Sequence, residues 1–260
     1  MPTFTHQGLT LHYRDQGSGT PVLLLHAFPL HGELFAPQLE ALTASHRLIA
    51  PDLRGFGQSQ PGPGPATMTT FAEDALALLD HLGIDAAVVG GVSMGGYAAL
   101  ALLQLDPSRV RALVLADTQM GADDEAGRAR REEVAREVER DGMGPLADSM
   151  LPRLLAQPAD SALEQKVRGW ILSNPPEGAA AASRGMGLRA DSRNILARFA
   201  GPALIVVGEK DVITPRAKAD AMANVLSHAQ VVEIPGAGHL ANLEQPEAFN
   251  RALDQFLRSL

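Results

Sequence analysis

The sequence contains no cysteine. This absence excludes disulfide bridges, a cysteine nucleophile and thiolate metal sites. Basic residues are also few, because 22 lysines and arginines stand against 30 acidic residues and give a net charge of −8. No basic cluster offsets this balance, so nucleic acid is not an expected partner.

Long apolar runs are absent as well. No segment has the length needed to span a bilayer, and the N-terminus lacks the basic start and apolar stretch of a signal peptide. We therefore expect a cytoplasmic protein without a membrane partner. Metal-binding patterns such as His-Glu-x-x-His are missing too, and we predict neither a metal nor a cofactor.

What the sequence does contain is an alternation of apolar runs and helical patterns within 260 residues, the size of one α/β domain. The alternation predicts a mostly parallel, doubly wound sheet. Thr69 or Thr70 is the predicted N-cap of the helix that runs to about residue 82. The predicted strands cover 4–6, 9–14, 22–25, 47–50, 86–90, 110–116, 204–208 and 230–234, and the predicted helices include 32–44, 95–105 and 246–257.

The alternation stops between residues 117 and 199, where only helical patterns occur. We expect residues 121–198 to form a helical insertion into a core made of residues 1–120 and 199–260. Residues 125–140 hold five arginines and five glutamates. This run is typical of a solvated helix with ion pairs four residues apart, although a binding surface has the same composition.

Residues 91–95 read Gly-Val-Ser-Met-Gly, between a predicted buried strand and a predicted helix. A serine at such a strand-to-helix turn has its hydroxyl exposed above the sheet, and the two glycines allow the turn to close. The N–H groups at the start of the helix favour negative charge there. Glycine patterns that bind phosphate do not match this segment. Ser93 is therefore the predicted nucleophile.

A serine nucleophile needs a histidine as base and an acid to orient it. Asp211 follows one late strand and His239 follows the next, so the chain order is Ser93, Asp211, His239. The carboxyl ends of parallel strands share one edge of a sheet, where these three side chains can meet. Asp117, after the strand 110–116, is the alternative acid.

Five segments together resemble the α/β-hydrolase fold superfamily, in particular its carboxylesterases, 3-oxoadipate enol-lactonase-like hydrolases and cofactor-free haloperoxidases. The resemblance implies an eight-stranded, mostly parallel sheet flanked by helices, with a helical cap over the site. Ala27 departs from the pattern, because the family usually has glycine there. The segments are His26-Ala-Phe-Pro29, Asp52-Leu-Arg-Gly-Phe-Gly-Gln-Ser59, Gly91-Val-Ser-Met-Gly-Gly96, Gly208-Glu-Lys-Asp211 and Gly236-Ala-Gly-His239.

The oxyanion hole should use the backbone N–H of Met94, the residue after the nucleophile. By resemblance, Phe28 supplies the second N–H. We interpret His26 as structural, with its ring bonded to the backbone beside this loop; a direct catalytic role is the alternative. Asp52 and Arg54 are interpreted as residues that fix a second loop.

Phe28, Trp170 and Leu240 are the predicted substrate-binding residues, with ordinary packing as the alternative for Trp170. The predicted function is that of a serine hydrolase that cleaves a small carboxylic ester or lactone through an acyl-enzyme. Alternatives with the same residues are carbon–carbon bond hydrolysis and cofactor-free perhydrolase or haloperoxidase activity. A ligand-binding protein without catalysis is a further alternative.

Overall fold

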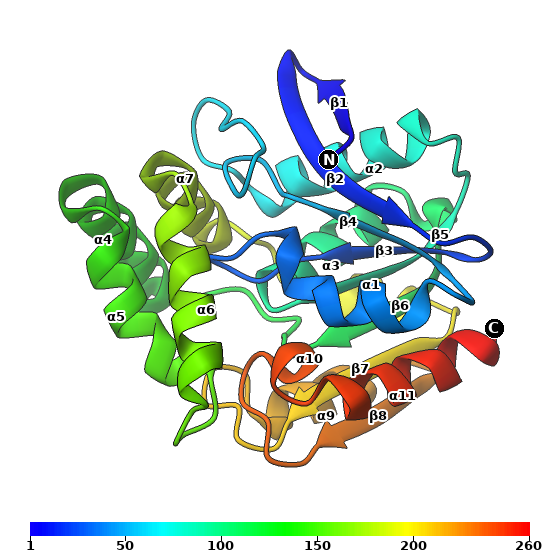
Figure 1. Ribbon diagram of the computed structural model, residues 1–260. Coiled ribbons are helices and arrows are strands. Elements are labelled where there is room, and N and C mark those ends of the chain that lie inside the picture. Colours follow the sequence, from blue (N-terminus) through cyan, green and yellow to red (C-terminus); the bar gives the residue numbers. More distant parts are fainter.

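The computed structural model describes residues 1–260 and is built on one eight-stranded sheet (Figure 1). The strands lie in the order β1-β2-β4-β3-β5-β6-β7-β8. β1 and β2, and β2 and β4, pair antiparallel, while all later neighbours pair parallel. The predicted mostly parallel sheet is confirmed. Its strands are β1 (Thr3–His6), β2 (Leu9–Gln16), β3 (Pro21–Leu25), β4 (Arg47–Pro51), β5 (Ala87–Val92), β6 (Val110–Ala116), β7 (Ala203–Gly208) and β8 (Ala229–Ile234).

Helices cover both faces of the sheet. α1 (Ala36–Leu42) and α11 (Pro246–Arg258) pack together on one face, and α2 (Met68–His81) and α3 (Met94–Leu105) on the other (Figure 1). With both faces covered, β5 and β7 are buried along their whole length, as expected of central parallel strands. β8 lies at the edge and is only partly buried.

Two predicted helices differ in detail. The predicted helix 32–44 is a 3₁₀ turn, η1 (Gly32–Phe35), followed by α1. The prediction of Thr69 or Thr70 as the N-cap of α2 is wrong, because Thr67 has that position and its hydroxyl accepts a hydrogen bond from the N–H of Thr70 at 3.1 Å. Three threonines within four residues all suit an N-cap.

A helical insertion separates β6 from β7, as predicted. It comprises α4 (Glu125–Asp141), α5 (Met143–Leu154), α6 (Ser161–Ser173), α7 (Pro176–Gly187) and α8 (Arg193–Arg198). α8 packs against α3, whereas α4–α7 stand together at one end of the sheet, on the left in Figure 1. We call α4–α7 and the loops between them the cap. None of the helices combines the length and apolar character required to cross a membrane.

The cap shares the hydrophobic core of the sheet. Val138 of α4, Leu146 of α5 and Ile171 of α6 belong to the same continuous cluster of buried side chains as the central strands. The charged run on α4 carries the expected ion pairs, such as Arg136 with Glu132 at 2.8 Å, with both side chains exposed. The cap is therefore packed against the core rather than tethered to it.

Candidate active site

Ser93 occupies a tight turn between β5 and α3, with φ 53° and ψ −113°. Positive φ is uncommon outside glycine and has to be held by the surrounding structure. A Cβ atom at Gly91 would lie 2.1 Å from the carbonyl carbon of Gly95, and one at Gly95 would lie 1.9 Å from the carbonyl oxygen of Leu25. Thr118 donates its hydroxyl to the carbonyl of Ser93 at 2.8 Å. The flanking glycines therefore let the turn close.

His239 and Asp211 form a buried pair. Nδ1 of His239 lies 2.9 Å from Oδ2 of Asp211, and both side chains are almost fully buried. Asp211 also accepts hydrogen bonds from the N–H groups of Ile213 and Thr214 and from the Thr214 hydroxyl. Burial opposes ionisation of Asp211, but the bonds from His239 and Thr214 outweigh it and lower the pKa of this carboxyl. A proton on Nδ1 leaves Nε2 of His239 as the basic nitrogen.

The register of the sheet places these residues at one edge. Val92 pairs with Ala116, Ala116 with Val206, and Gly208 with Ile234, so the chain leaves β5, β7 and β8 on the same side. The hydroxyl of Ser93 makes no hydrogen bond with Nε2 of His239 in this structure. Such bonds are often long before substrate binds.

Asp117, the alternative acid, has a different environment. Its carboxylate accepts hydrogen bonds from the N–H groups of Gly208 at 2.8 Å and Ala241 at 3.2 Å. Burial, and next the charge of Asp211, raise the pKa of Asp117 well above its usual value. No hydrogen bond joins it to His239. This geometry favours Asp211 as the partner of the histidine, whereas Asp117 ties the end of β6 to the end of β7 and to the start of α10 (Ala241–Glu244).

The two predicted oxyanion donors lack partners within the protein. The N–H of Phe28 donates to no protein acceptor, and that of Met94 is the first in α3, where a helix offers no acceptor. Both residues are buried. Backbone N–H groups without a partner in buried residues are rare in proteins, so these two groups are free to bind an acceptor that the protein itself does not supply.

His26 is bonded to the backbone on both sides of its ring, as predicted. Its Nε2 accepts from the N–H of Leu53 at 3.0 Å, so Nδ1 carries the proton and donates to the carbonyl of Ala27 at 3.0 Å. Burial lowers the pKa of His26 to about 4. Ala27 itself does not have positive φ, which explains why alanine is accommodated where glycine is usual.

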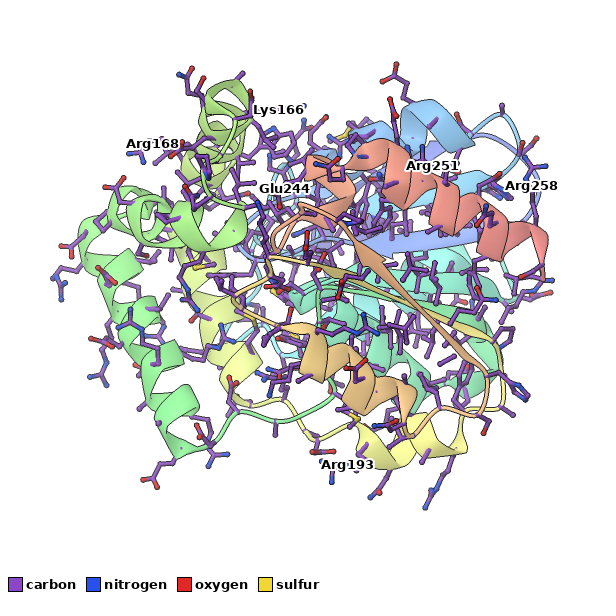
Figure 2. The ribbon with its side chains drawn as sticks, turned by 90° about the horizontal axis from the view of Figure 1, so that it is seen from below. Lys166, Arg168, Arg193, Glu244, Arg251 and Arg258 are labelled. Atoms are coloured by element: carbon purple, nitrogen blue, oxygen red, sulfur yellow. The ribbon has the colours of Figure 1, made fainter.

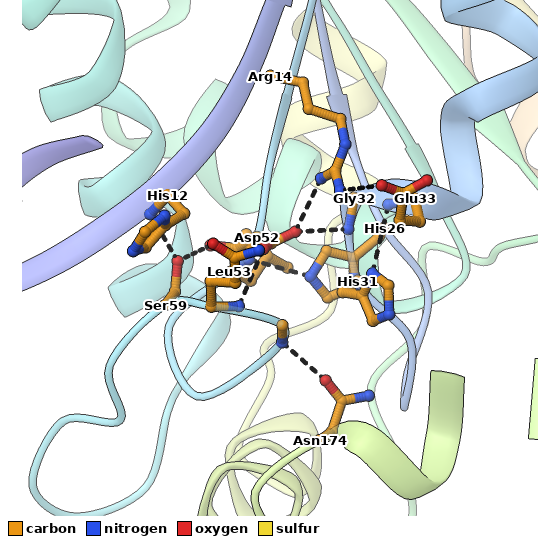
Figure 3. Close-up of polar contacts among 12 residues, drawn as sticks. His12, Arg14, His26, His31, Gly32, Glu33, Asp52, Leu53, Ser59 and Asn174 are labelled. Carbon is orange, nitrogen blue, oxygen red and sulfur yellow. Dashed lines mark hydrogen bonds and ion pairs between the residues drawn. The ribbon is translucent and has the colours of Figure 1, made fainter. Parts of the chain in front are cut away.

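Asp52 fixes the neighbouring loop, also as predicted (Figure 3). Its carboxylate accepts from the N–H groups of Gly32 at 2.8 Å and Gln58 at 3.0 Å, and the Ser59 hydroxyl donates to its carbonyl at 2.6 Å. Arg54 is turned away from Asp52 and binds the buried carboxylate of Asp74. Neither charge is directed at Ser93 by these bonds, so their role is structural.

Two cap-to-core contacts were not predictable from sequence motifs. Asn174, between α6 and α7, bonds to the loop after β3 and to the loop after β4. Glu244 accepts from the N–H groups of Gly238 at 2.9 Å and of the cap residue Ala156 at 2.7 Å. Figure 2 shows Glu244 between the green helices of the cap and the red C-terminal helices. Neither residue lies in a motif, and only the fold reveals its partners.

The predicted substrate-binding residues lie around the same region. Phe28 is buried and its ring meets that of Phe56 edge to face. Trp170 of α6 is partly buried, 5.6 Å from the ring of His31 between centroids. Leu240, directly after His239, is fully buried. Phe28 and Trp170 keep some exposed surface that a ligand can contact, whereas Leu240 keeps none. Contact of these residues with substrate stays a prediction.

Comparison with known proteins agrees with this architecture. Residues 20–246 match the family model described as alpha/beta hydrolase fold. The chain is 32% identical to 3-oxoadipate enol-lactonase 1 of Acinetobacter baylyi, over 98% of this chain and 95% of that protein. A thermophilic esterase of Thermogutta terrifontis, solved with malate bound, superposes with a TM-score of 0.95 at 42% identity, over 99% of this chain and 96% of that one. The enol-lactonase of Burkholderia xenovorans LB400 superposes with a TM-score of 0.91 at 28% identity, over 99% of this chain and 100% of that one. The chain thus belongs to the α/β-hydrolase fold family.

Proposed function

We propose that this protein is a serine hydrolase that cleaves a small carboxylic ester or lactone through an acyl-enzyme. The observation that carries the proposal is the neighbourhood of Ser93. A serine in a strained turn lies at the sheet edge where a buried Asp211–His239 pair also lies, and the predicted oxyanion donors, the N–H groups of Met94 and Phe28, have no acceptor within the protein. The relatives described as an esterase and as enol-lactonases support the same class of substrate.

The reaction follows from these positions. The hydroxyl oxygen of Ser93 attacks the carbonyl carbon while Nε2 of His239 takes the hydroxyl proton. Asp211, ionised because its pKa is lowered, stabilises the resulting imidazolium. The carbonyl oxygen becomes an oxyanion and accepts from the N–H groups of Phe28 and Met94, each worth roughly 10²–10³ in rate.

Collapse of this intermediate breaks the ester bond. His239 returns its proton to the departing alcohol or, in a lactone, to the ring oxygen that becomes the free hydroxyl. A water molecule then gives a proton to His239 and attacks the acyl carbon. The bond between this carbon and the oxygen of Ser93 breaks, His239 returns the proton to that oxygen, and the acid is released. No group other than these residues and water is needed to balance the steps.

A fluorophosphonate probe tests the proposal. We expect the probe to label the folded protein at Ser93, as located by peptide mass spectrometry, and p-nitrophenyl esters and simple lactones to be hydrolysed. Ser93→Ala should abolish labelling and lower turnover by at least roughly 10⁴-fold. Labelling at another residue, or a Ser93→Ala protein that retains turnover, would overturn the proposal. A series of acyl chain lengths would then define the substrate range.

A further inference from the structure

We infer that Asn174, a residue of the cap, positions the oxyanion-binding N–H of Phe28 through a chain of hydrogen bonds. The inference rests on the proposed function of Ser93 and Phe28. The hydrogen bonds of Asn174 go to Gly57, Pro29 and Trp170 and not to Ser93 or Phe28, so its role is that of a positioning residue. Its consequence is that correct docking of the cap contributes directly to stabilisation of the reacting oxyanion.

The side-chain amide of Asn174 has hydrogen-bond partners on both its nitrogen and its oxygen. The residue is 2% exposed. Its Nδ2 donates to the carbonyls of Pro29 at 2.8 Å and Trp170 at 2.9 Å, and its Oδ1 accepts from the N–H of Gly57 at 2.7 Å (Figure 3). Exchange of the amide oxygen and nitrogen would place like groups together at all three contacts. The orientation of the amide is therefore unique, with one N–H directed at the loop after β3.

From Pro29 the hydrogen bonds continue to Phe28. The carbonyl of Pro29 and the N–H of Leu30 are two ends of one peptide group, and Leu30 donates to the carbonyl of Ala27 at 2.9 Å. That carbonyl shares a peptide group with the N–H of Phe28. The two cis peptide bonds of the chain are Phe28–Pro29 and Gln157–Pro158, so the Ala27–Phe28 bond is trans. Its carbonyl and its N–H therefore point in opposite directions.

The peptide groups thus form an aligned series from Asn174 through Pro29–Leu30 to Ala27–Phe28. Hydrogen bonds in series polarise one another, by roughly 10–30% per bond. The larger effect is geometric, because the plane of the Ala27–Phe28 peptide is set by what its carbonyl accepts, from Leu30 and from the ring of His26. Asn174 anchors the far end of this series, and the free N–H of Phe28 is its near end.

Two other hydrogen-bonded contacts of the cap lie outside this series. Glu244 bonds to the loop that carries His239, and Ser183 of α7 donates to the carbonyl of Arg131 within the cap at 2.8 Å. Ser183, fully buried, therefore offers a matched control. Its replacement by alanine removes one buried cap hydrogen bond and leaves the series to Phe28 intact.

Two substitutions remove the donor. Asn174→Asp keeps the shape of the side chain and the acceptor for Gly57, but a carboxylate cannot donate to Pro29. Asn174→Ala removes all three bonds. Loss of a whole oxyanion donor costs roughly 10²–10³ in kcat, and misalignment costs part of that. We expect kcat to fall roughly 10- to 100-fold in both variants, with KM within about threefold of the wild type.

A trifluoromethyl ketone with the acyl group of the ester supplies a readout that a loosened cap alone would not change. Its adduct with Ser93 puts an oxyanion in the hole, so its inhibition constant should rise by the same factor as kcat falls. Ser183→Ala should leave both quantities within about twofold. The melting temperatures of all variants show that folded protein is compared.

The inference is wrong if the Asn174 variants lose only thermal stability or substrate affinity while kcat and ketone inhibition stay at wild-type values. It is also wrong if kcat falls and ketone inhibition does not change. These results differ from failure of the proposed function, which would be seen in the wild type as absence of labelling and turnover at Ser93 and would remove both proposals together.

Discussion

The buried ring of His26 should make the stability of this protein depend on pH. Burial lowers the pKa of the folded imidazole to about 4, from 6.5 in an exposed histidine. Between these values the unfolded chain takes up a proton at His26 and the folded chain does not. The unfolded state therefore binds more protons, and the free energy of unfolding falls as the pH falls through this window.

The two pKa values give the size of this effect. At pH 8 His26 is neutral in both the folded and the unfolded chain, so its protonation takes nothing from the free energy of unfolding. At pH 5 the unfolded histidine is almost fully protonated and the folded one is neutral, which corresponds to a loss of about 2 kcal/mol relative to pH 8. Below the folded pKa the loss reaches its limit of about 3 kcal/mol.

Urea unfolding of wild-type protein and of His26→Gln at pH 8 and pH 5 measures this contribution. Glutamine has a donor and an acceptor for Ala27 and Leu53 but does not titrate in this range. Groups other than His26 titrate alike in both proteins, so their effects cancel in the difference. The stability advantage of the wild type over His26→Gln should shrink by about 2 kcal/mol at pH 5. An equal advantage at both pH values would refute the reasoning.

Three further outcomes are expected. Asp211→Asn should lower kcat roughly 10⁴-fold because it no longer orients the histidine as base, whereas Asp117→Asn should have a much smaller effect; steady-state rates that fall equally in both would contradict this assignment. Glu244→Gln should leave at least one buried N–H without an acceptor and lower the free energy of unfolding by about 1–3 kcal/mol. Urea unfolding measures this change, and an unchanged midpoint would count against the contact. Gly178→Ala should lower the melting temperature, since its Cβ would lie 1.8 Å from the carbonyl oxygen of Gly55. Overpacking destabilises by about 1–3 kcal/mol, which exceeds the gain of at most ~1 kcal/mol from the better helix propensity of alanine. The matched control Gly169→Ala, with no atom within 4 Å of the new Cβ, should not lower it.

The parts of the site that sequence could predict are those set by local chemistry. Gly91 and Gly95 around Ser93 are required by the turn itself, so the pattern indicates the turn wherever it occurs. Asp211 and His239 each follow a buried apolar strand, and the geometry of parallel sheets brings such positions to one edge. These predictions need no knowledge of how distant segments pack.

Asn174 and Glu244, which join the cap to the core, could not be predicted because their partners are set by how distant segments pack. Asn174 precedes two prolines after a helical pattern, and in the sequence it has the character of an ordinary helix end. Glu244 lies in a short polar stretch before the last helix. Their contacts between cap and core join backbone groups of segments that are 88 to 145 residues away in the chain, and backbone groups leave no pattern in a sequence.

These contacts determine what the cap does for the site. The N–H of His239 donates to the carbonyl of Leu154 in the cap at 3.1 Å, and Glu244 binds Ala156 and Gly238 together. Asn174 holds the loop that contains Phe28. Without the cap, the loop that carries His239 and the loop that contains Phe28 would both lose hydrogen-bond partners that fix their backbone. The cap is therefore part of the scaffold that holds these two loops in place.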